Sequence, residues 1–184
     1  MAQSWRVRSY GKRKARPPLD AEALDRLVLA YVGRYATTRA RLRTFLRRKL
    51  RERGWQGEGE APIDPLVERM AALGYVNDSA FASSRATSLQ RRGFGERRIA
   101  QALAAAGIEA EVAEAAREQI RAGAAAAALR FAERRHIGPF SPGTPDRAAR
   151  EKAFAAMLRA GHPIDLVKRI IGARPGEVPE LRDS

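Results

Sequence analysis

Apolar side chains recur every three or four residues along most of the chain, and this spacing places them on one face of an α-helix. The first stretch, over about residues 20–35, carries Leu24, Leu27, Val28, Tyr31 and Val32. The same spacing predicts helices over about 38–54, 64–74 and 77–92, from the break at Gly93 and Gly95 to Gly107, and over about 109–123, 124–135, 146–161 and 164–172. Because no stretch alternates apolar and polar residues for more than a few positions, no strand is predicted.

Residues suited to helix starts precede several of these stretches. Asp20 and Asp146 occupy N-cap positions, where a side-chain oxygen can accept a hydrogen bond from a free backbone amide. Thr37 or Thr38 can do the same for the second helix. Asp64-Pro65 predicts the start of the third, with the acid as the cap and proline as the first helical residue.

The composition agrees with this pattern. Alanine, the strongest helix former, occurs 36 times, whereas the β-branched residues Val, Ile and Thr together number 21. Hydrophobic residues make up 45% of the 184 positions, which is enough for a buried core. We therefore predict an all-α protein and exclude a disordered basic chain.

Three glycines that end predicted helices recur at a nearly constant interval. Gly54, Gly107 and Gly161 are 53 and 54 residues apart, and an isoleucine next to an acidic residue follows each of them. This spacing predicts three copies of a three-helix unit that stack side by side in an elongated array, which can be curved. The predicted parts are a flexible basic arm at 1–19, units at 20–74, 75–122 and 123–172, and a tail at 173–184.

Residues that carry catalytic or metal chemistry are few. The absence of cysteine excludes disulfides, thiolate zinc sites and cysteine nucleophiles. His136 and His162 have no second histidine or cysteine three or four residues away, so we expect both to be ordinary surface or loop residues. Ser83, Ser84 and Ser88 have no nearby histidine to activate them. The sequence therefore predicts a protein that is not an enzyme and that needs no metal or cofactor.

The chain has no apolar segment of the roughly eighteen residues needed to span a bilayer. Its first residues also lack the apolar core of a signal peptide. We expect a cytoplasmic protein, a monomer, with no membrane partner.

The formal net charge of +14 is concentrated at one end of the chain. Residues 1–54 hold sixteen Lys and Arg against four Asp and Glu, a net charge of +12, and the remaining residues carry a net charge of +2. A localised positive field indicates a polyanionic partner. Nucleic acid is the first candidate, with an acidic membrane surface or an acidic protein as alternatives.

The predicted helix at 38–54 carries the densest group of cations. Four of them lie four residues apart and form a stripe along one face: Arg39, Arg43, Arg47 and Arg51. The neighbouring cations are Arg41, Arg48, Lys49 and Arg53, and the only acid among them is Glu52. Such a helix can lay guanidinium groups along a phosphate backbone. The alternative is a solvated amphipathic face.

A second group of cations surrounds the turn Gly93-Phe94-Gly95. Backbone amides at the start of the next helix, together with arginine, can hold a phosphate. The alternative is a plain helix-to-helix turn, with Arg92 and Arg98 as contacts for an anion or a partner. The candidate binding residues from both groups are Arg39, Arg43, Arg47, Arg48, Lys49, Arg51, Arg92, Arg97 and Arg98.

The N-terminal arm is also basic and has no acid before Asp20. Its cations are Arg6, Arg8, Lys12, Arg13, Lys14 and Arg16, and it also contains Trp5 and Tyr10. Aromatic rings can stack on bases, so one interpretation is an arm that folds onto nucleic acid. The other is a flexible, solubilising arm.

The stretch from Leu73 to Ile108 resembles the RecX family of bacterial regulatory proteins. The pattern begins with L-G-Y-hydrophobic-[ND]-D, which F-A follows. The next element is R-x-G-x-G-x-x-R-I, and the last is L-x-x-x-G-I. The positions that carry it are Leu73, Gly74, Tyr75, Asp78, Phe81, Ala82, Arg92, Gly93, Gly95, Arg98, Ile99, Leu103, Gly107 and Ile108. Weaker similarity on both sides extends the resemblance over about residues 20–172.

The resemblance implies tandem three-helix repeats that bind RecA and the filament it forms on single-stranded DNA. It further implies that the protein modulates RecA in DNA repair and recombination, usually by inhibiting its recombinase, ATPase and co-protease activities. In this interpretation the basic first unit contacts DNA, and the later units contact RecA. The alternative is a general DNA-binding or transcription-regulating helical protein that recognises duplex DNA.

Overall fold

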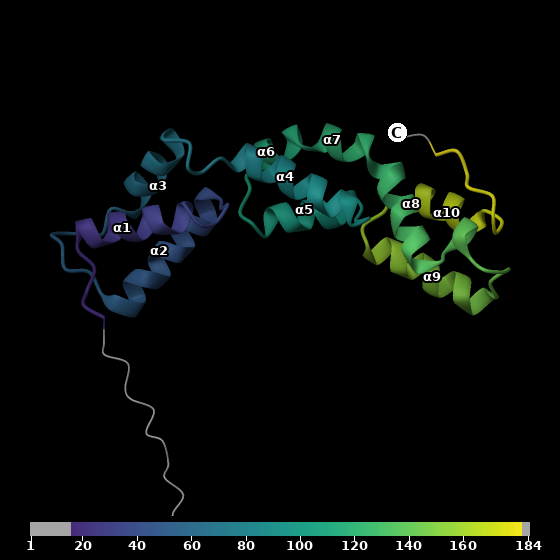
Figure 1. Cartoon of the computed structure of the whole chain (residues 1–184), viewed down its shortest axis with the longest axis horizontal. Helices are drawn as coiled ribbons and strands as arrows, with labels where there is room; N and C mark the ends of the chain where they lie inside the picture. Colours follow the sequence, from purple (N-terminus) through teal and green to yellow (C-terminus); the bar gives the residue numbers. More distant parts are fainter. Residues whose placement is uncertain (1–15, 182–184) are drawn as a thin grey trace, which may run out of the picture.

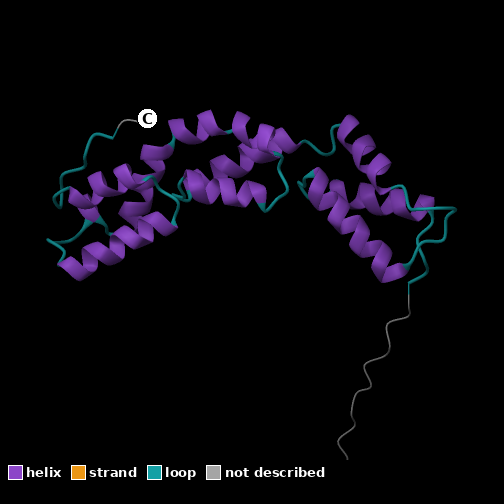
Figure 2. Cartoon of the chain, turned by 180° about the vertical axis from the view of Figure 1, so that it is seen from behind, coloured by secondary structure: helices purple, strands orange, loops and turns teal. Residues whose placement is uncertain are grey.

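The computed structural model of the chain describes residues 16–181. The helices in chain order are α1 (Ala21–Val32), α2 (Arg39–Arg53), α3 (Ile63–Ala72), α4 (Asp78–Arg91), α5 (Glu96–Ala104), α6 (Ala110–Ala115), α7 (Arg117–Ala122), α8 (Ala124–Arg135), α9 (Arg147–Arg159) and α10 (Ile164–Gly172). Between 16 and 181 no β-strand is present, and one isolated bridge joins Leu19 to Trp55 (Figure 2). The prediction of an all-α protein is confirmed.

Three predicted helix caps are confirmed. Asp20, Thr38 and Asp146 each precede a helix, and the side chain of each accepts a hydrogen bond from the amide three residues later. Each cap satisfies one of the donors that a helix start leaves without an intrahelical partner. The starts of α1, α2 and α9 are therefore set by local sequence.

Other boundaries differ from the predicted ones. α3 begins at Ile63, with Pro62 at its N-cap, so Asp64 lies inside the first turn and does not cap the helix. The predicted helix at 109–123 is divided at Ala116 into α6 and α7, and both segments pack against α4. The predicted loop at 136–145 contains a 3-10 helix at Gly138–Phe140.

Three hydrophobic cores divide the helices into groups that follow one another in an arch (Figure 1). We name them the first unit (α1–α3), the second unit (α4–α7) and the third unit (α8–α10). Their cores contain, for example, Leu42 and Leu46, Ile99 and Leu103, and Met157. We propose that these units are the repeats predicted at 20–74, 75–122 and 123–172.

The second helices of the units, α2, α5 and α9, lie along the lower, concave edge of the arch in Figure 1. At the first joint the N-terminal end of α2 meets the C-terminal end of α5. The hydroxyl of Thr38, which is fully buried, donates a hydrogen bond of 2.6 Å to the carbonyl of Ala106. Gly107 has φ +71, and a Cβ there would lie 2.2 Å from the Cβ of Ala40. Only glycine fits this close contact.

The second joint has the same arrangement, because the N-terminal end of α5 meets the C-terminal end of α9. The amide of Gly95 donates to the carbonyl of Ala160 at 2.9 Å, and the amide of Arg97 donates to that of Gly161 at 3.2 Å. A Cβ on Gly95 would lie 2.4 Å from the carbonyl carbon of Gly161. Both joints therefore place the positive end of one helix dipole against the negative end of the next.

His162 is part of the second joint; it lies in the loop between α9 and α10, as one of the two predicted alternatives has it, but it is buried and not an ordinary exposed residue. Its side chain is buried, and Nε2 lies 3.1 Å from the carbonyl of Gly93. Since a carbonyl only accepts, Nε2 carries the proton, and Nδ1 has no partner. Burial lowers the pKa of His162 to about 4, and the bond to Gly93 opposes this shift. His136, in contrast, is exposed and ends α8 with a left-handed backbone at φ 52.

The second joint allows a test of stability. Replacing Gly95 by Ala should lower the free energy of unfolding by about 1–3 kcal/mol, because the added methyl group meets backbone atoms that cannot move aside. Gly143→Ala is the matched control, since a Cβ on Gly143 would have no atom within 4 Å. Urea unfolding of both variants provides the measurement. Equal stability of the two variants would contradict the close packing of α5 against α9.

The low pKa of His162 makes stability depend on pH. In the folded chain the ring stays neutral down to about pH 4, whereas in the unfolded chain it takes up a proton near its ordinary pKa of 6.5. Between pH 6.5 and about pH 4 the unfolded state therefore binds more protons than the folded state does. The free energy of unfolding falls as the pH falls through this interval. Between pH 7 and pH 5 the loss of folding free energy should be about 2 kcal/mol.

Urea titrations at both pH values, on the wild type and on His162→Gln, measure this contribution. The variant should lose about 2 kcal/mol less than the wild type over the same interval. His136→Asn is the control, because it removes the other histidine of the chain, which is exposed. The free energy of unfolding of this variant should change with pH as that of the wild type does. A His162→Gln variant with unchanged pH dependence would exclude a buried neutral ring.

Candidate nucleic-acid interface

The arginine stripe of α2 is divided by its contacts with α3. Arg43 Nε lies 2.7 Å from Asp64 Oδ1, and its Nη2 lies 2.8 Å from Glu68 Oε1. Arg39 Nε lies 3.3 Å from Glu68 Oε2, and its Nη1 is 3.8 Å from the buried Asp78. These guanidinium groups hold α2 against α3 and α4, so acidic groups of the chain itself occupy the first half of the stripe.

The second half of the stripe faces solvent. Arg47 and Arg51 are exposed, and no ion pair to either is present within residues 16–181. Arg48 and Lys49 share Glu52, at 3.7 Å and 2.6 Å. The hydrogen bond from Lys49 is the main reason that the pKa of Glu52 is lowered. Arg47 and Arg51 are therefore open to an anion from outside, whereas Arg48 and Lys49 already contact Glu52.

A different face of α2 joins the second unit in a surface free of acids. Three adjoining pockets of about 520, 550 and 370 Å³ lie there. Each pair of pockets has one residue in common: Arg41 for the first and second, Arg85 for the second and third, and Ala105 for the first and third. No Asp or Glu lines any of the three. The cations that line them are Arg41, Arg48, Arg85, Arg92 and Arg98, and the aromatic residues are Tyr31, Phe45, Tyr75, Phe81 and Phe94. We call these ten residues the arginine–aromatic surface.

Guanidinium groups stack on aromatic rings across this surface. The Cζ atom of Arg41 lies 5.2 Å from the ring centre of Phe81, so the contact crosses from the first unit to the second. Arg48 lies 5.7 Å from Phe45, and Arg92 lies 5.4 Å from Phe94. Stacking holds the charged groups beside the aromatic rings without neutralising them. The result is a row of cations with apolar platforms between them.

Arg97 has a structural contact in place of a free side chain. Its Nη2 donates a hydrogen bond of 2.5 Å to the carbonyl of Leu158 in α9. The amides of Gly95 and Arg97 also donate to the third unit, so these two amides of the α5 start are not free to hold a phosphate. The Gly93–Gly95 turn is thus a connection between units, and Arg92 and Arg98 line its exposed side.

The predicted candidates therefore fall into groups. Arg48, Arg92 and Arg98 lie in the arginine–aromatic surface, and Arg47 and Arg51 lie on another exposed face of α2. The candidates with partners in the chain are Arg39, Arg43, Lys49 and Arg97, and Arg48 has a longer contact of 3.7 Å with Glu52. Arg85 is absent from the predicted set, because its helix shows no cation pattern and only packing brings it beside Arg41.

Other predicted features have simpler outcomes. Most of the basic arm, namely Arg6, Arg8, Lys12, Arg13 and Lys14 with Trp5 and Tyr10, lies outside the described residues. Across the described part of the chain, no three His, Cys, Asp or Glu side chains form a group that could hold a metal ion. Among the helices of residues 16–181, none combines the length and apolar character needed to cross a bilayer.

Comparison with known proteins identifies the family. The model of the second three-helix domain of RecX matches residues 77–116, which include α4, α5 and α6. The regulatory protein RecX of Myxococcus xanthus is 33% identical over 89% of this chain and 95% of its own length, and that of Agrobacterium fabrum is 29% identical over 78% and 79%.

A solved structure agrees with the fold. RecX from Lactobacillus salivarius has a TM-score of 0.59 and 21% identity, and the match covers 82% of this chain and 94% of that chain. The relatives are regulatory proteins, in agreement with the prediction of a chain that is not an enzyme. The chain belongs to the RecX family of regulatory proteins.

Proposed function

We propose that this chain binds RecA and the filament that RecA forms on single-stranded DNA, and that it inhibits the activities of that filament. Membership of the RecX family supports a regulatory role. The observation that carries the DNA part of the proposal is the arginine–aromatic surface, where five arginines and five aromatic residues line three pockets without any acid.

The chemistry of this surface suits a single strand better than a duplex. In a single strand the bases are free to stack on aromatic side chains, and the phosphates can pair with arginine. In a duplex the bases already stack on one another, so rings such as those of Phe81 and Phe94 add little. The stacked pairs Arg41–Phe81 and Arg92–Phe94 offer both types of contact side by side.

The arch supports the rest of the proposal. The arginine–aromatic surface belongs to the first and second units, and the third unit continues the array beyond the second joint (Figure 1). A protein of this shape can follow a polymer over more than one subunit, with DNA contacts near one end and protein contacts along the remainder. We assign RecA contact to the second and third units.

The function is tested by the ATPase activity of RecA on single-stranded DNA. Addition of this protein should suppress ATP hydrolysis at substoichiometric amounts, because one molecule bound along a filament affects several subunits. The measurement is steady-state hydrolysis over a wide titration. A rate of ATP hydrolysis that stays constant over the whole titration would exclude the proposal. Tight, sequence-dependent binding to duplex DNA without RecA would favour the alternative of a duplex-binding regulator.

The DNA path is tested by the salt dependence of binding to oligothymidylate. The double variant Arg41→Ala, Arg85→Ala should reduce the slope of log K against log salt by about 1.4, which corresponds to two lost phosphate contacts on a single strand. The reason is that each arginine lies between two of the pockets, Arg41 between the first and the second and Arg85 between the second and the third.

Arg39→Ala, Arg43→Ala is the matched control, since it removes the same charge from residues already paired with acids. Its slope should stay near that of the wild type. If the control lowers the slope and the Arg41, Arg85 variant does not, the strand lies along the arginine stripe of α2 and not along the arginine–aromatic surface.

A further inference from the structure

The third unit carries a second positively charged depression, separate from the arginine–aromatic surface. It consists of two pockets, of about 270 and 780 Å³, that share Pro145, Arg150 and Ile171. The cations that line it are Arg135, Arg150, Lys152, Lys168 and Arg174. Glu177 is the one acidic residue that lines either pocket. We call this depression the third-unit groove.

Local backbone geometry forms the inner, smaller pocket. His136 ends α8 with a left-handed backbone, and Gly138 follows with φ +59, so the chain turns sharply below the end of the helix. Ile137 lies between these residues and is buried. A Cβ on Gly138 would lie 2.0 Å from the carbonyl oxygen of Ile170, so this turn packs tightly against α10.

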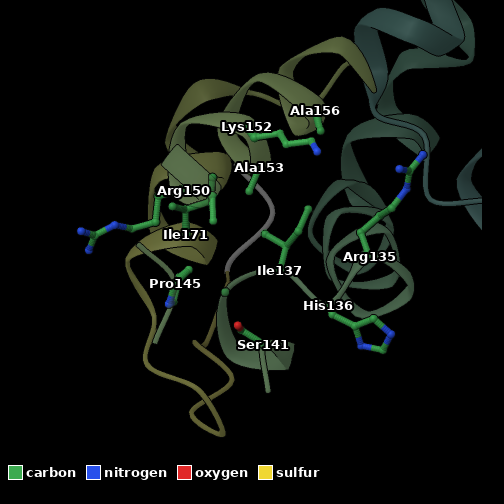
Figure 3. Close-up of a pocket in the computed structure, with 12 residues that line it drawn as sticks. Arg135, His136, Ile137, Ser141, Pro145, Arg150, Lys152, Ala153, Ala156 and Ile171 are labelled. Atoms are coloured by element: carbon green, nitrogen blue, oxygen red, sulfur yellow. The ribbon is translucent and has the colours of Figure 1, made fainter. Parts of the chain in front are cut away.

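The floor of the inner pocket is aliphatic and its sides are cationic. Figure 3 shows Ile137 between Ala153 of α9 and the end of α8, with Lys152 on one side and Arg135 on the other. Ile171 contributes a further apolar side chain from α10. No Phe, Tyr or Trp lines this pocket, in contrast to the arginine–aromatic surface, and its one ring is the imidazole of His136.

Glu177 apart, the acids nearest to the groove in sequence are engaged elsewhere. Glu151 of α9 accepts a hydrogen bond of 2.8 Å from Arg147, which lies on the same helix. Asp146 caps α9 by accepting from the amide of Ala149 at 2.7 Å. The cations of the groove are therefore left for a ligand from outside, and the excess of positive charge requires that ligand to be acidic.

We propose that the third-unit groove binds an acidic segment of a partner protein, with one aliphatic side chain in the inner pocket and carboxylates beside Lys152 and Arg150. An aliphatic anchor matches the floor of Ile137, Ala153 and Ile171. Nucleic acid is a poorer match, because single-strand sites offer several large aromatic rings on which successive bases stack. The inner pocket has no Phe, Tyr or Trp, and Phe154 is the one such residue that lines the outer pocket. This inference goes beyond the proposed function, since it assigns a second ligand chemistry to a separate surface.

The test uses the full chain and a fluorescent, acetylated peptide with one leucine between two aspartates on each side. Fluorescence anisotropy should detect saturable binding. Lys152→Glu should weaken it by about tenfold or more, because the substitution turns an attraction into a repulsion. A peptide with serine in place of the leucine should lose about tenfold as well, because the apolar anchor is gone.

Two variants complete the design. Ala149→Trp places a bulky ring at the exposed mouth of the inner pocket without changing the charge. This variant should abolish binding of the peptide, because the ring blocks entry of the leucine. Arg121→Glu on α7 is the charge-matched control, since Arg121 is exposed and lies outside the groove, and it should change the affinity less than about twofold. Thermal unfolding of each variant verifies that it is folded.

The proposal is overturned by absence of saturable peptide binding, by equal losses in Lys152→Glu and Arg121→Glu, or by displacement of the peptide by oligothymidylate. Binding of oligothymidylate to Lys152→Glu should equal its binding to Arg121→Glu. The peptide result is therefore independent of the DNA result at the arginine–aromatic surface, and either proposal can fail alone.

Discussion

The end-to-end contact between consecutive second helices is the interaction on which the rest of the structure depends. Each unit has its own core, and the units meet where the start of one helix donates to the last carbonyls of the next. Thr38 at the first joint and Gly95 at the second perform the same task with different atoms, a hydroxyl and a backbone amide. Because helix ends leave these groups without intrahelical partners, the joint satisfies donors and acceptors that a single unit would leave exposed to water.

The joints also determine where positive charge is available. Docking of α2 onto α3 and α4 brings Arg39 and Arg43 against Glu68 and Asp78, so part of the most basic helix is used internally. The same docking leaves Arg41 on the opposite side, stacked on Phe81 of the second unit. The distribution of unpaired cations therefore follows from packing between units, and the count of +12 on the first 54 residues does not reveal it.

Sequence periodicity predicted the helices, because each helix depends on residues close together in the chain. It could not predict the burial of His162, since the carbonyl of Gly93 that it contacts lies 69 residues away. Arg85 is absent from the sequence-based candidates for the same reason. The hydrogen bond from the candidate Arg97 to Leu158 could not be predicted either, because the two residues are 61 positions apart. A pattern within one helix is therefore sufficient to propose candidate residues, whereas contacts made where two units meet depend on packing that the sequence does not show.

The two cationic surfaces differ in what lies between the charges, and this difference separates their ligands. Aromatic rings alternate with arginine from Tyr31 to Phe94, whereas Ile137, Ala153 and Ile171 form the floor of the inner pocket in the third unit. The second joint, with its backbone hydrogen bonds from Gly95 and Arg97, connects the units that carry these surfaces. A partner that presents both a single strand and an acidic segment must therefore match the spacing that the arch imposes, so that spacing contributes to specificity beyond the chemistry of either surface alone.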